Sequence, residues 1–345
     1  MKKIILLTAI LAALSTSLFA KAKKANKNTG NIKIVTTIFP EYDWTRELLG
    51  NKRENTELSL LIGNGVDLHS YQPSIQDIAK ISTADIFIYV GGESDGWVKD
   101  ALKNATNKNM KVINLLEILG DKVKAEEIKE GMQAEEEEHE HHHGEDEEHE
   151  EEHHHDSEHH HHDEEDEVEY DEHVWLSLRN AKVFCAEIAS ALCEKDAANA
   201  SVYKANLAAY SAKLDALDKQ YAATVNAGSK KTVLFGDRFP FRYLVDDYNL
   251  DYFAAFVGCS AETEASFETV IFLSKKIDEL GLNTVLKLES GDGKIARTIA
   301  QNTKNKNVQV LTMDSIQSTT LKQAISGTTY LSIMEENLKV LKEAL

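Results

Sequence analysis

Short apolar runs alternate with amphipathic stretches over the first third of this chain. The runs have the length of strands and are rich in aliphatic residues; they cover residues 32–37, 57–61, 86–90 and 111–114. Helical spacing of apolar positions fills the intervals, around residues 43–49, around residues 75–80 and from about Asp95 onward. Strands that alternate with helices favour a parallel α/β sheet.

The last third of the chain repeats this alternation. Strand-length apolar runs cover residues 232–235, 252–256, 284–287 and 308–311, with helical patterns at 241–248, at 266–280, between the last two strands and at 328–343. The repetition predicts a second parallel α/β sheet, although no repeat is visible residue by residue.

Between the two halves the pattern is helical and contains no proline. A break near residues 195–199 divides a shorter helix from a longer one at 202–225, which would reach about 35 Å. The longer helix has one apolar stripe, formed by Leu207, Tyr210, Leu214, Leu217 and Tyr221. We therefore predict two α/β lobes, 31–179 and 231–345, joined by a stiff helical connector at 180–227.

The N-terminus has the pattern of a secretory signal peptide over residues 1–20. Lys2 and Lys3 precede a mostly apolar run, and cleavage is expected after Ala20 or Ala22. No cysteine lies near this point, so we do not expect a lipid anchor. The sequence predicts an exported, periplasmic protein.

Charge and histidine are concentrated in one segment. Residues 135–172 hold 22 carboxylates and no lysine or arginine, whereas the whole chain has a formal charge of -20, so the remainder is close to neutral. The segment also holds 12 of the 14 histidines: His139, His141, His142, His143, His149, His153, His154, His155, His159, His160, His161 and His162. Acidic low-complexity runs are usually disordered and solvated, but histidine at this density favours metal capture. We interpret residues 133–170 as a disordered insertion in the first lobe that helps to load metal.

The two histidines outside the segment occur in similar surroundings. His69 follows Asp67 by two residues, and His173 follows Asp171 by two residues, each beside apolar or aromatic neighbours. A metal-bound imidazole needs its second nitrogen held by a carboxylate or carbonyl, which either aspartate can supply. A buried structural role is the alternative for each histidine taken alone.

These motifs resemble those of the metal-binding solute receptors of bacterial ABC transporters, in the zinc/manganese group. Residues 67–74 (DLHSYQPS) are similar to the D-P-H-x-Y-x-P segment of that family, and residues 171–176 (DEHVWL) to its D-P-H-V-W segment. Tyr203 and Asn206 match its Y-x-x-N pattern, and residues 258–266 match its G-x-S-x-E-x-E-P-S segment. The resemblance extends over essentially all of the chain after the signal peptide.

The resemblance implies one metal ion between two lobes. His69 and His173 would be ligands from the first lobe, and Asp314 matches a carboxylate ligand from the second. Gly236 stands where the family has a histidine or glutamate, so the remaining ligand is open. Asp237 is one candidate for this ligand, although it could instead cap a turn or helix. The other candidates are Glu289, water or a histidine of the insertion.

We therefore expect capture of a divalent metal, zinc before manganese, and its delivery to a membrane permease with a cytoplasmic ATPase. A monomer is expected, and a periplasmic zinc buffer or chaperone is the alternative. An enzyme is not expected, because no clear nucleophile with its base is recognisable in the sequence. The strongly negative net charge of the chain also argues against nucleic acid as a partner.

The three cysteines were assigned no part in the chemistry. Cys185 and Cys193 lie eight residues apart in a predicted helix, about 12 Å along its axis, which is too far for a disulfide. Cys259 has no zinc-type C-x-x-C partner. A disulfide from Cys259 to one of the other two stays open, and we interpret all three as structural or incidental.

Overall fold

The computed structural model describes residues 31–133, 169–260 and 264–345. The predicted signal peptide and the histidines of the insertion lie outside these residues. No helix in the described part is long and apolar enough to cross a membrane.

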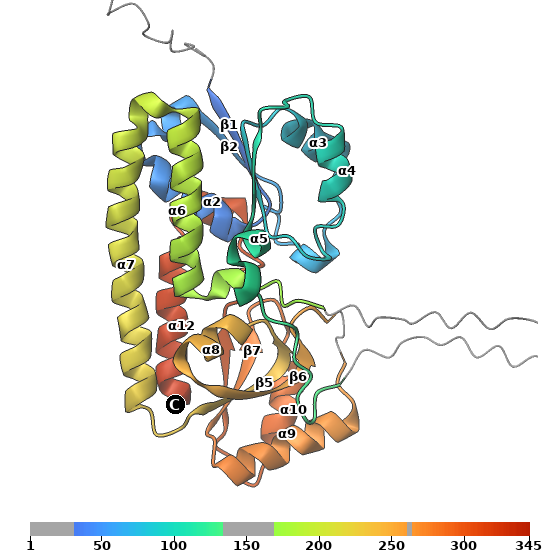
Figure 1. Cartoon of the computed structure of the whole chain (residues 1–345). Coiled ribbons are helices and arrows are strands. Elements are labelled where there is room, and N and C mark those ends of the chain that lie inside the picture. The colour runs from blue at the N-terminus through green and yellow to red at the C-terminus, as the bar shows by residue number, and fades with distance from the viewer. Residues whose placement is uncertain (1–30, 134–168, 261–263) are drawn as a thin grey trace, which may run out of the picture. The chain divides into compact units, whose positions relative to one another are not determined.

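Two four-stranded parallel sheets form the framework of the unit from Ile32 to Leu345 (Figure 1). The first sheet has the order β2(Thr56–Leu60), β1(Ile32–Thr36), β3(Ile86–Tyr89) and β4(Lys111–Asn114). The second has the order β6(Asp251–Val257), β5(Thr232–Phe239), β7(Thr284–Leu288) and β8(Gln309–Met313). Each sheet therefore places its strands in the order second, first, third and fourth along the chain, which confirms the predicted pair of α/β lobes.

Helices cover both faces of each sheet. Those of the first lobe are α2(Phe39–Leu49), α3(Ile75–Ser82), α4(Val98–Lys103) and α5(Leu115–Leu119). Those of the second are α8(Arg242–Tyr248), α9(Phe267–Leu280), α10(Lys294–Asn302) and α12(Tyr330–Ala344), whereas α11(Leu321–Ile325) packs against α2 of the first lobe. The connecting helices are α6(Leu178–Lys195) and α7(Ala200–Ala227). Short 3-10 turns are η1(Gly50–Asn55), η2(Leu68–Ser70), η3(Gly120–Lys122), η4(Val174–Leu176) and η5(Ala197–Asn199).

The long connector is confirmed, and three helices differ from the sequence prediction. Helix α2 begins at Phe39, four residues before the predicted start, because Pro40 occupies the first turn. Proline is well tolerated there, since the N–H that it lacks would have no partner within the helix. Helices α5 and α11 are short and were not predicted.

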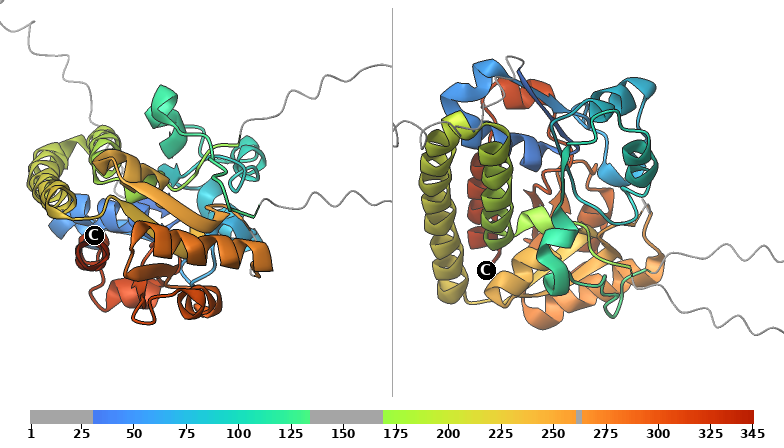
Figure 2. Two further views of the ribbon diagram at one scale, coloured as in Figure 1. Left: turned by 90° about the horizontal axis from the view of Figure 1, so that it is seen from below. Right: turned by 45° about the horizontal axis from the view of Figure 1, so that its top comes forward.

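One hydrophobic core extends through both lobes. A single cluster of buried side chains contains Ile34 and Trp44 from the first lobe, Tyr221 from the connector, and Phe235 and Tyr330 from the second. Helices α6, α7 and α12 lie side by side along both sheets (Figures 1 and 2). Smaller separate clusters lie under α3 and α4 in one lobe and under α9 and α10 in the other. The lobes therefore share packing as well as a covalent connection.

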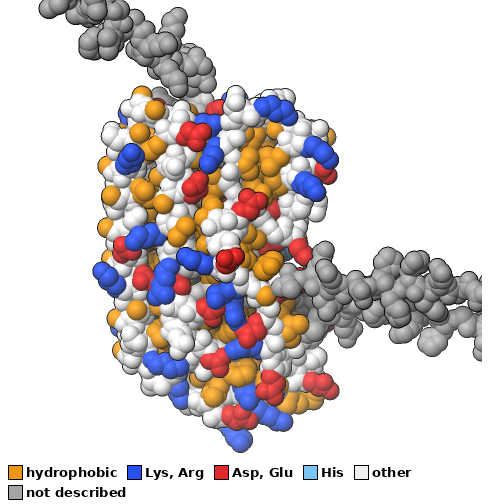
Figure 3. Space-filling view, in the orientation of Figure 1, with side chains coloured by type: hydrophobic (Ala, Val, Ile, Leu, Met, Phe, Trp, Pro, Cys, Tyr) orange, Lys and Arg blue, Asp and Glu red, His pale blue; other side chains and the backbone are white. Residues whose placement is uncertain are grey.

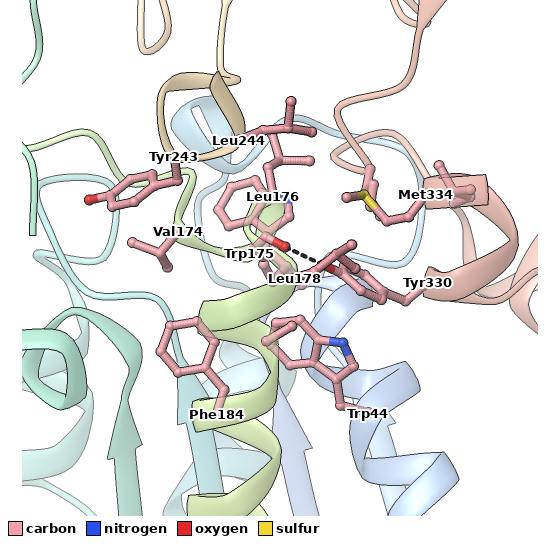
Figure 4. Packing of buried hydrophobic residues seen from close by; sticks show 14 of the residues in the cluster. Trp44, Val174, Trp175, Leu176, Leu178, Phe184, Tyr243, Leu244, Tyr330 and Met334 are labelled. Carbon is pink, nitrogen blue, oxygen red and sulfur yellow. Dashed lines mark hydrogen bonds between the residues drawn. The ribbon is translucent and has the colours of Figure 1, made fainter. Parts of the chain in front are cut away.

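Trp175 lies where the two lobes meet in this core (Figure 4). Its indole nitrogen donates to the Ser315 carbonyl at 2.9 Å, and its own carbonyl accepts from the Tyr330 hydroxyl at 2.7 Å. Tyr330 also packs edge-on against Trp44 of α2, with ring centroids 5.2 Å apart. All three aromatic residues are essentially fully buried. These bonds fix the segment around Trp175 against the second lobe.

Charge is evenly mixed over the described surface that Figure 3 shows. Lysine and arginine side chains are interspersed there with aspartate and glutamate. This mixture agrees with the near-neutral sum of the chain outside residues 135–172.

We expect Tyr330→Phe to lower the free energy of unfolding by about 1–3 kcal/mol, because the buried Trp175 carbonyl would lose its hydrogen-bond donor. Urea unfolding of the metal-free protein measures this. Tyr221→Phe is a matched comparison, since it removes a similarly buried bond to the Met334 carbonyl. A Tyr330→Phe variant as stable as wild type would contradict the role given to this bond.

Candidate metal centre

His69 and His173 meet between the carboxyl ends of the two sheets. His69 lies in η2, after strand β2, where Asp67 caps the turn by accepting from the His69 N–H at 3.1 Å. His173 lies directly before η4, and Asp171 accepts from its N–H at 2.8 Å. The two Nε2 atoms are 3.2 Å apart. Two nitrogen ligands of one tetrahedral zinc are separated by about 3.3 Å, so the imidazoles already have the spacing that such an ion needs.

The outer nitrogen of each ring is held by a polar partner. His173 Nδ1 lies 3.0 Å from Asp171 Oδ1, and His69 Nδ1 lies 2.8 Å from Ser94 Oγ. A carboxylate oxygen of Glu172 is 3.5 Å from His69 Nδ1. Partners of this kind fix the ring orientation and leave Nε2 free to bind a metal.

The two rings differ in their affinity for a proton. Burial and the neighbouring His173 lower the pKa of His69 to about 3. Burial alone would also lower the pKa of His173, but the charge and hydrogen bond of Asp171 outweigh it, so the pKa of His173 is raised. A positive charge in the metal-free pair is therefore favoured on His173 over His69.

Cys259 approaches the same point from the second lobe. It follows strand β6, and its Sγ and one nitrogen from each imidazole all lie within 4.8 Å of one another. Among residues 31–133, 169–260 and 264–345, the histidine, cysteine and acidic side chains close enough together to hold one metal ion are His69, His173 and Cys259. Burial, together with the charge of Glu126, raises the pKa of the Cys259 thiol, so the thiol is neutral without a metal.

Gly236 and Asp237 do not join this group. A Cβ atom at Gly236 would lie 2.5 Å from the Ala296 Cα, so the position that the resemblance assigns to a ligand has no room for a side chain. Asp237 accepts from the backbone N–H of Leu288 at 3.0 Å and from that of Arg238 at 2.9 Å. Its carboxylate thus joins the ends of strands β5 and β7.

Asp314 and Glu289 also lie outside the group. Asp314 accepts from the Ile316 N–H at 2.7 Å, and burial together with the charge of Glu289 raises its pKa to about 7. Glu289 accepts from the Ser315 backbone and hydroxyl and from the Ser318 hydroxyl. The two acids therefore support the turn after strand β8.

Two polar contacts cross between the lobes beside the histidines. Arg238 donates to Asp67 at 2.8 Å. With its amide oriented so that the NH2 group faces Asp67, Gln317 donates to both oxygens of Asp67, at 2.7 and 3.1 Å, and accepts from His173 Nε2 at 2.9 Å. The sequence analysis predicted no role for Gln317, Ser94 or Arg238. Both contacts between the lobes join residues that are far apart in the sequence, so a local sequence pattern cannot predict them.

The histidine-rich insertion begins and ends close to this centre. Gln133, its first residue, donates from its N–H to the Ala255 carbonyl at 2.9 Å and accepts from the Ser266 N–H at 2.8 Å. Tyr170, its last residue, forms an antiparallel bridge with Ala125, and Asp171 follows directly. One end of the insertion thus contacts strand β6, which precedes Cys259, and the other end lies three residues before His173 in the sequence.

Comparison with known proteins identifies relatives over the whole of this architecture. A family model described as zinc-uptake complex component A, periplasmic, matches residues 34–344. The zinc-binding protein AdcA of Streptococcus pyogenes is 28% identical over 99% of this chain, and the zinc-binding lipoprotein AdcA of Streptococcus pneumoniae is 32% identical over 99%. This chain covers 61% of the length of each of those two proteins. The high-affinity zinc uptake system protein ZnuA of Bacillus subtilis is 28% identical, with 93% of this chain and 90% of that protein covered.

Solved structures show the same fold. The Zn(II)-bound ZnuA-like domain of Streptococcus pneumoniae AdcA is 26% identical and superposes with a TM-score of 0.66, covering 91% of this chain and 99% of that domain. The lipoprotein YcdH of Bacillus subtilis, at 24% identity and a TM-score of 0.68, supports the fold alone. Both the matching family model and the Bacillus subtilis relative are described as parts of zinc uptake systems.

We expect Asp171→Asn to weaken metal binding by about 10- to 100-fold, because the amide keeps the hydrogen bonds of His173 and removes the charge behind its ring. Competition for zinc against a chelator of known affinity measures this. Asp100→Asn, at an exposed aspartate of α4, is the control. Equal affinity in the wild type and the Asp171 variant would show that this carboxylate does not support the site.

Proposed function

Since this chain belongs to the family of periplasmic zinc-uptake complex components, we propose that it captures Zn²⁺ outside the cytoplasm and delivers it to an ABC permease. The observation that carries the proposal is the 3.2 Å separation of His69 Nε2 and His173 Nε2, which suits two ligands of one zinc ion. The permease and its cytoplasmic ATPase are the partners that the family implies.

Zinc binding would replace hydrogen bonds of the metal-free site. His173 Nε2 must give up its proton and its bond to Gln317 before it can donate a lone pair. Gln317 belongs to the second lobe and also holds Asp67 of the first, so its release alters a contact between the lobes. The permease would distinguish the loaded receptor from the empty one by such local changes, because the shared core opposes a large movement of the lobes.

Manganese is the second candidate that the sequence left open. Mn²⁺ is harder than Zn²⁺ and takes more oxygen ligands. The second-lobe carboxylates that would supply them, Asp237 and Asp314, accept hydrogen bonds from backbone N–H groups. Because these hydrogen bonds already engage the carboxylates, fewer oxygen ligands are available for Mn²⁺, which favours zinc.

The insertion would act as an accessory to this site. Many loosely placed imidazoles bind metal weakly and exchange it fast, so a tether of them raises the local metal concentration near the cleft. The attachment points at Gln133 and Tyr170 support this role because they lie on segments that lead to the centre. Export by a cleaved signal peptide to a soluble periplasmic location belongs to the same proposal, although two of the similar proteins are named lipoproteins.

We expect the metal-free protein to bind one zinc ion tightly and His69→Ala to weaken that site by about 100-fold or more, because one of two imidazole ligands is lost. Calorimetry with a competing chelator separates this site from weak binding by the insertion. Ser70→Ala, at an exposed neighbour, should bind as the wild type does. Many weak sites without a tight one would support the buffer alternative.

Deletion of residues 135–166 should leave the tight site intact and slow its loading at low zinc. The expected readouts are unchanged affinity and slower zinc accumulation in zinc-starved cells. A variant with every histidine of the insertion replaced by glutamine, and every carboxylate kept, separates imidazole binding from charge. Equal uptake by the wild type and both variants would show that the insertion has no loading role.

A further inference from the structure

We propose that the Cys259 thiolate is the second-lobe ligand of this site and that it makes the site selective for thiophilic divalent cations. The inference rests on the proposed function, because it names the donor that completes the His69–His173 pair. A thiolate in this place differs from the histidine or glutamate that the resemblance led us to expect.

Position is the first argument. Cys259 comes from the loop after β6, on the opposite lobe from His69, and its Sγ lies within 4.8 Å of a nitrogen from both imidazoles. In a tetrahedral zinc site a sulfur and a nitrogen ligand are about 3.5 Å apart. A shift of about 1 Å, within the reach of a side-chain adjustment, would bring the sulfur into bonding distance.

The loop is built to approach His173 closely. A Cβ atom at Gly258 would lie 3.1 Å from His173 Cε1 and 2.9 Å from the Phe239 carbonyl oxygen, so a side chain there would push the loop away from the ring. Glu126 accepts from the Cys259 N–H at 3.0 Å and fixes the other side of the loop. Together these contacts hold the cysteine against the imidazoles.

The other second-lobe candidates are engaged elsewhere. Gly236 has no space for a side chain, since Ala296 of α10 packs directly on it. Asp237 and Asp314 accept hydrogen bonds from the backbone N–H groups of Leu288 and Ile316. Cys259 is therefore the described second-lobe donor that faces the histidine pair.

The chemistry of binding is a simple exchange. The metal–sulfur bond forms as the S–H bond breaks, and the proton leaves to solvent or buffer, with no change of oxidation state. Thiolate is a soft ligand that favours Zn²⁺ over Mn²⁺, which prefers oxygen. Cys259 would thus set the preference between the two metals that sequence alone left open.

The test uses Co²⁺ as a spectroscopic probe of the reduced, full-length mature protein. One equivalent of Co²⁺ should give a thiolate-to-cobalt charge-transfer band in the near ultraviolet, and added Zn²⁺ should remove it. Histidines and carboxylates of the insertion do not give this band, so the full chain can be used. Cys193→Ser is the matched control, because Cys193 is also a half-buried cysteine but lies on α6.

The expected result is a band in the wild type and in Cys193→Ser, and no band in Cys259→Ser. The Cys259 variant should also bind Zn²⁺ roughly tenfold or more weakly while its Mn²⁺ affinity changes less. A tight zinc site that needs His69 but gives no charge-transfer band would overturn the thiolate assignment and leave the proposed receptor function standing. That outcome is read from the wild type, so it does not depend on whether Cys259→Ser folds. The absence of any tight site would overturn both proposals.

Discussion

The position of His173 depends on how Trp175 is held two residues later. Trp175 belongs to the segment that ends the first lobe, yet both of its polar groups bond to the second, through Ser315 and Tyr330. Tyr330 in turn packs on Trp44 of α2, so the contact closes a loop from one lobe to the other and back. A buried polar group that loses its hydrogen-bond partner destabilises the folded state. These bonds, together with the packing of the core, therefore fix the distance between the two lobes.

That constraint explains why the imidazoles are ready for a metal before one arrives. Both Nε2 atoms face the same point because their Nδ1 atoms are occupied, and the interlobe packing keeps them 3.2 Å apart. A site assembled in advance loses little conformational entropy on binding, which favours affinity. The corresponding cost is electrostatic: burial and the neighbouring His173 lower the pKa of His69, so the two rings resist carrying a positive charge each.

Strand-length apolar runs were enough to predict both sheets. The repeated acid-x-histidine spacing singled out His69 and His173, which the structure brings together, and their role as ligands stays a prediction. The start of α2 was misplaced because Pro40 was not recognised as a first-turn residue. Cys259, by contrast, carries no local signal of its role. Its proximity to the histidines arises from two lobes that meet, and neither its spacing nor its neighbours in sequence reveal that meeting.

The departure at Gly236 and the presence of Cys259 are best understood together. Close packing of α10 on strand β5 requires a glycine, because any Cβ would collide with the Ala296 backbone, and this packing removes the ligand position expected from the resemblance. A donor must then come from a neighbouring strand end of the same sheet, and β6 lies next to β5 in the sheet order. A long acidic side chain at 259 would place a second carboxylate beside Glu126, whereas a thiol is neutral until a metal displaces its proton. A cysteine at position 259 therefore provides a donor where Gly236 cannot, and it adds no second negative charge beside Glu126 in the metal-free protein.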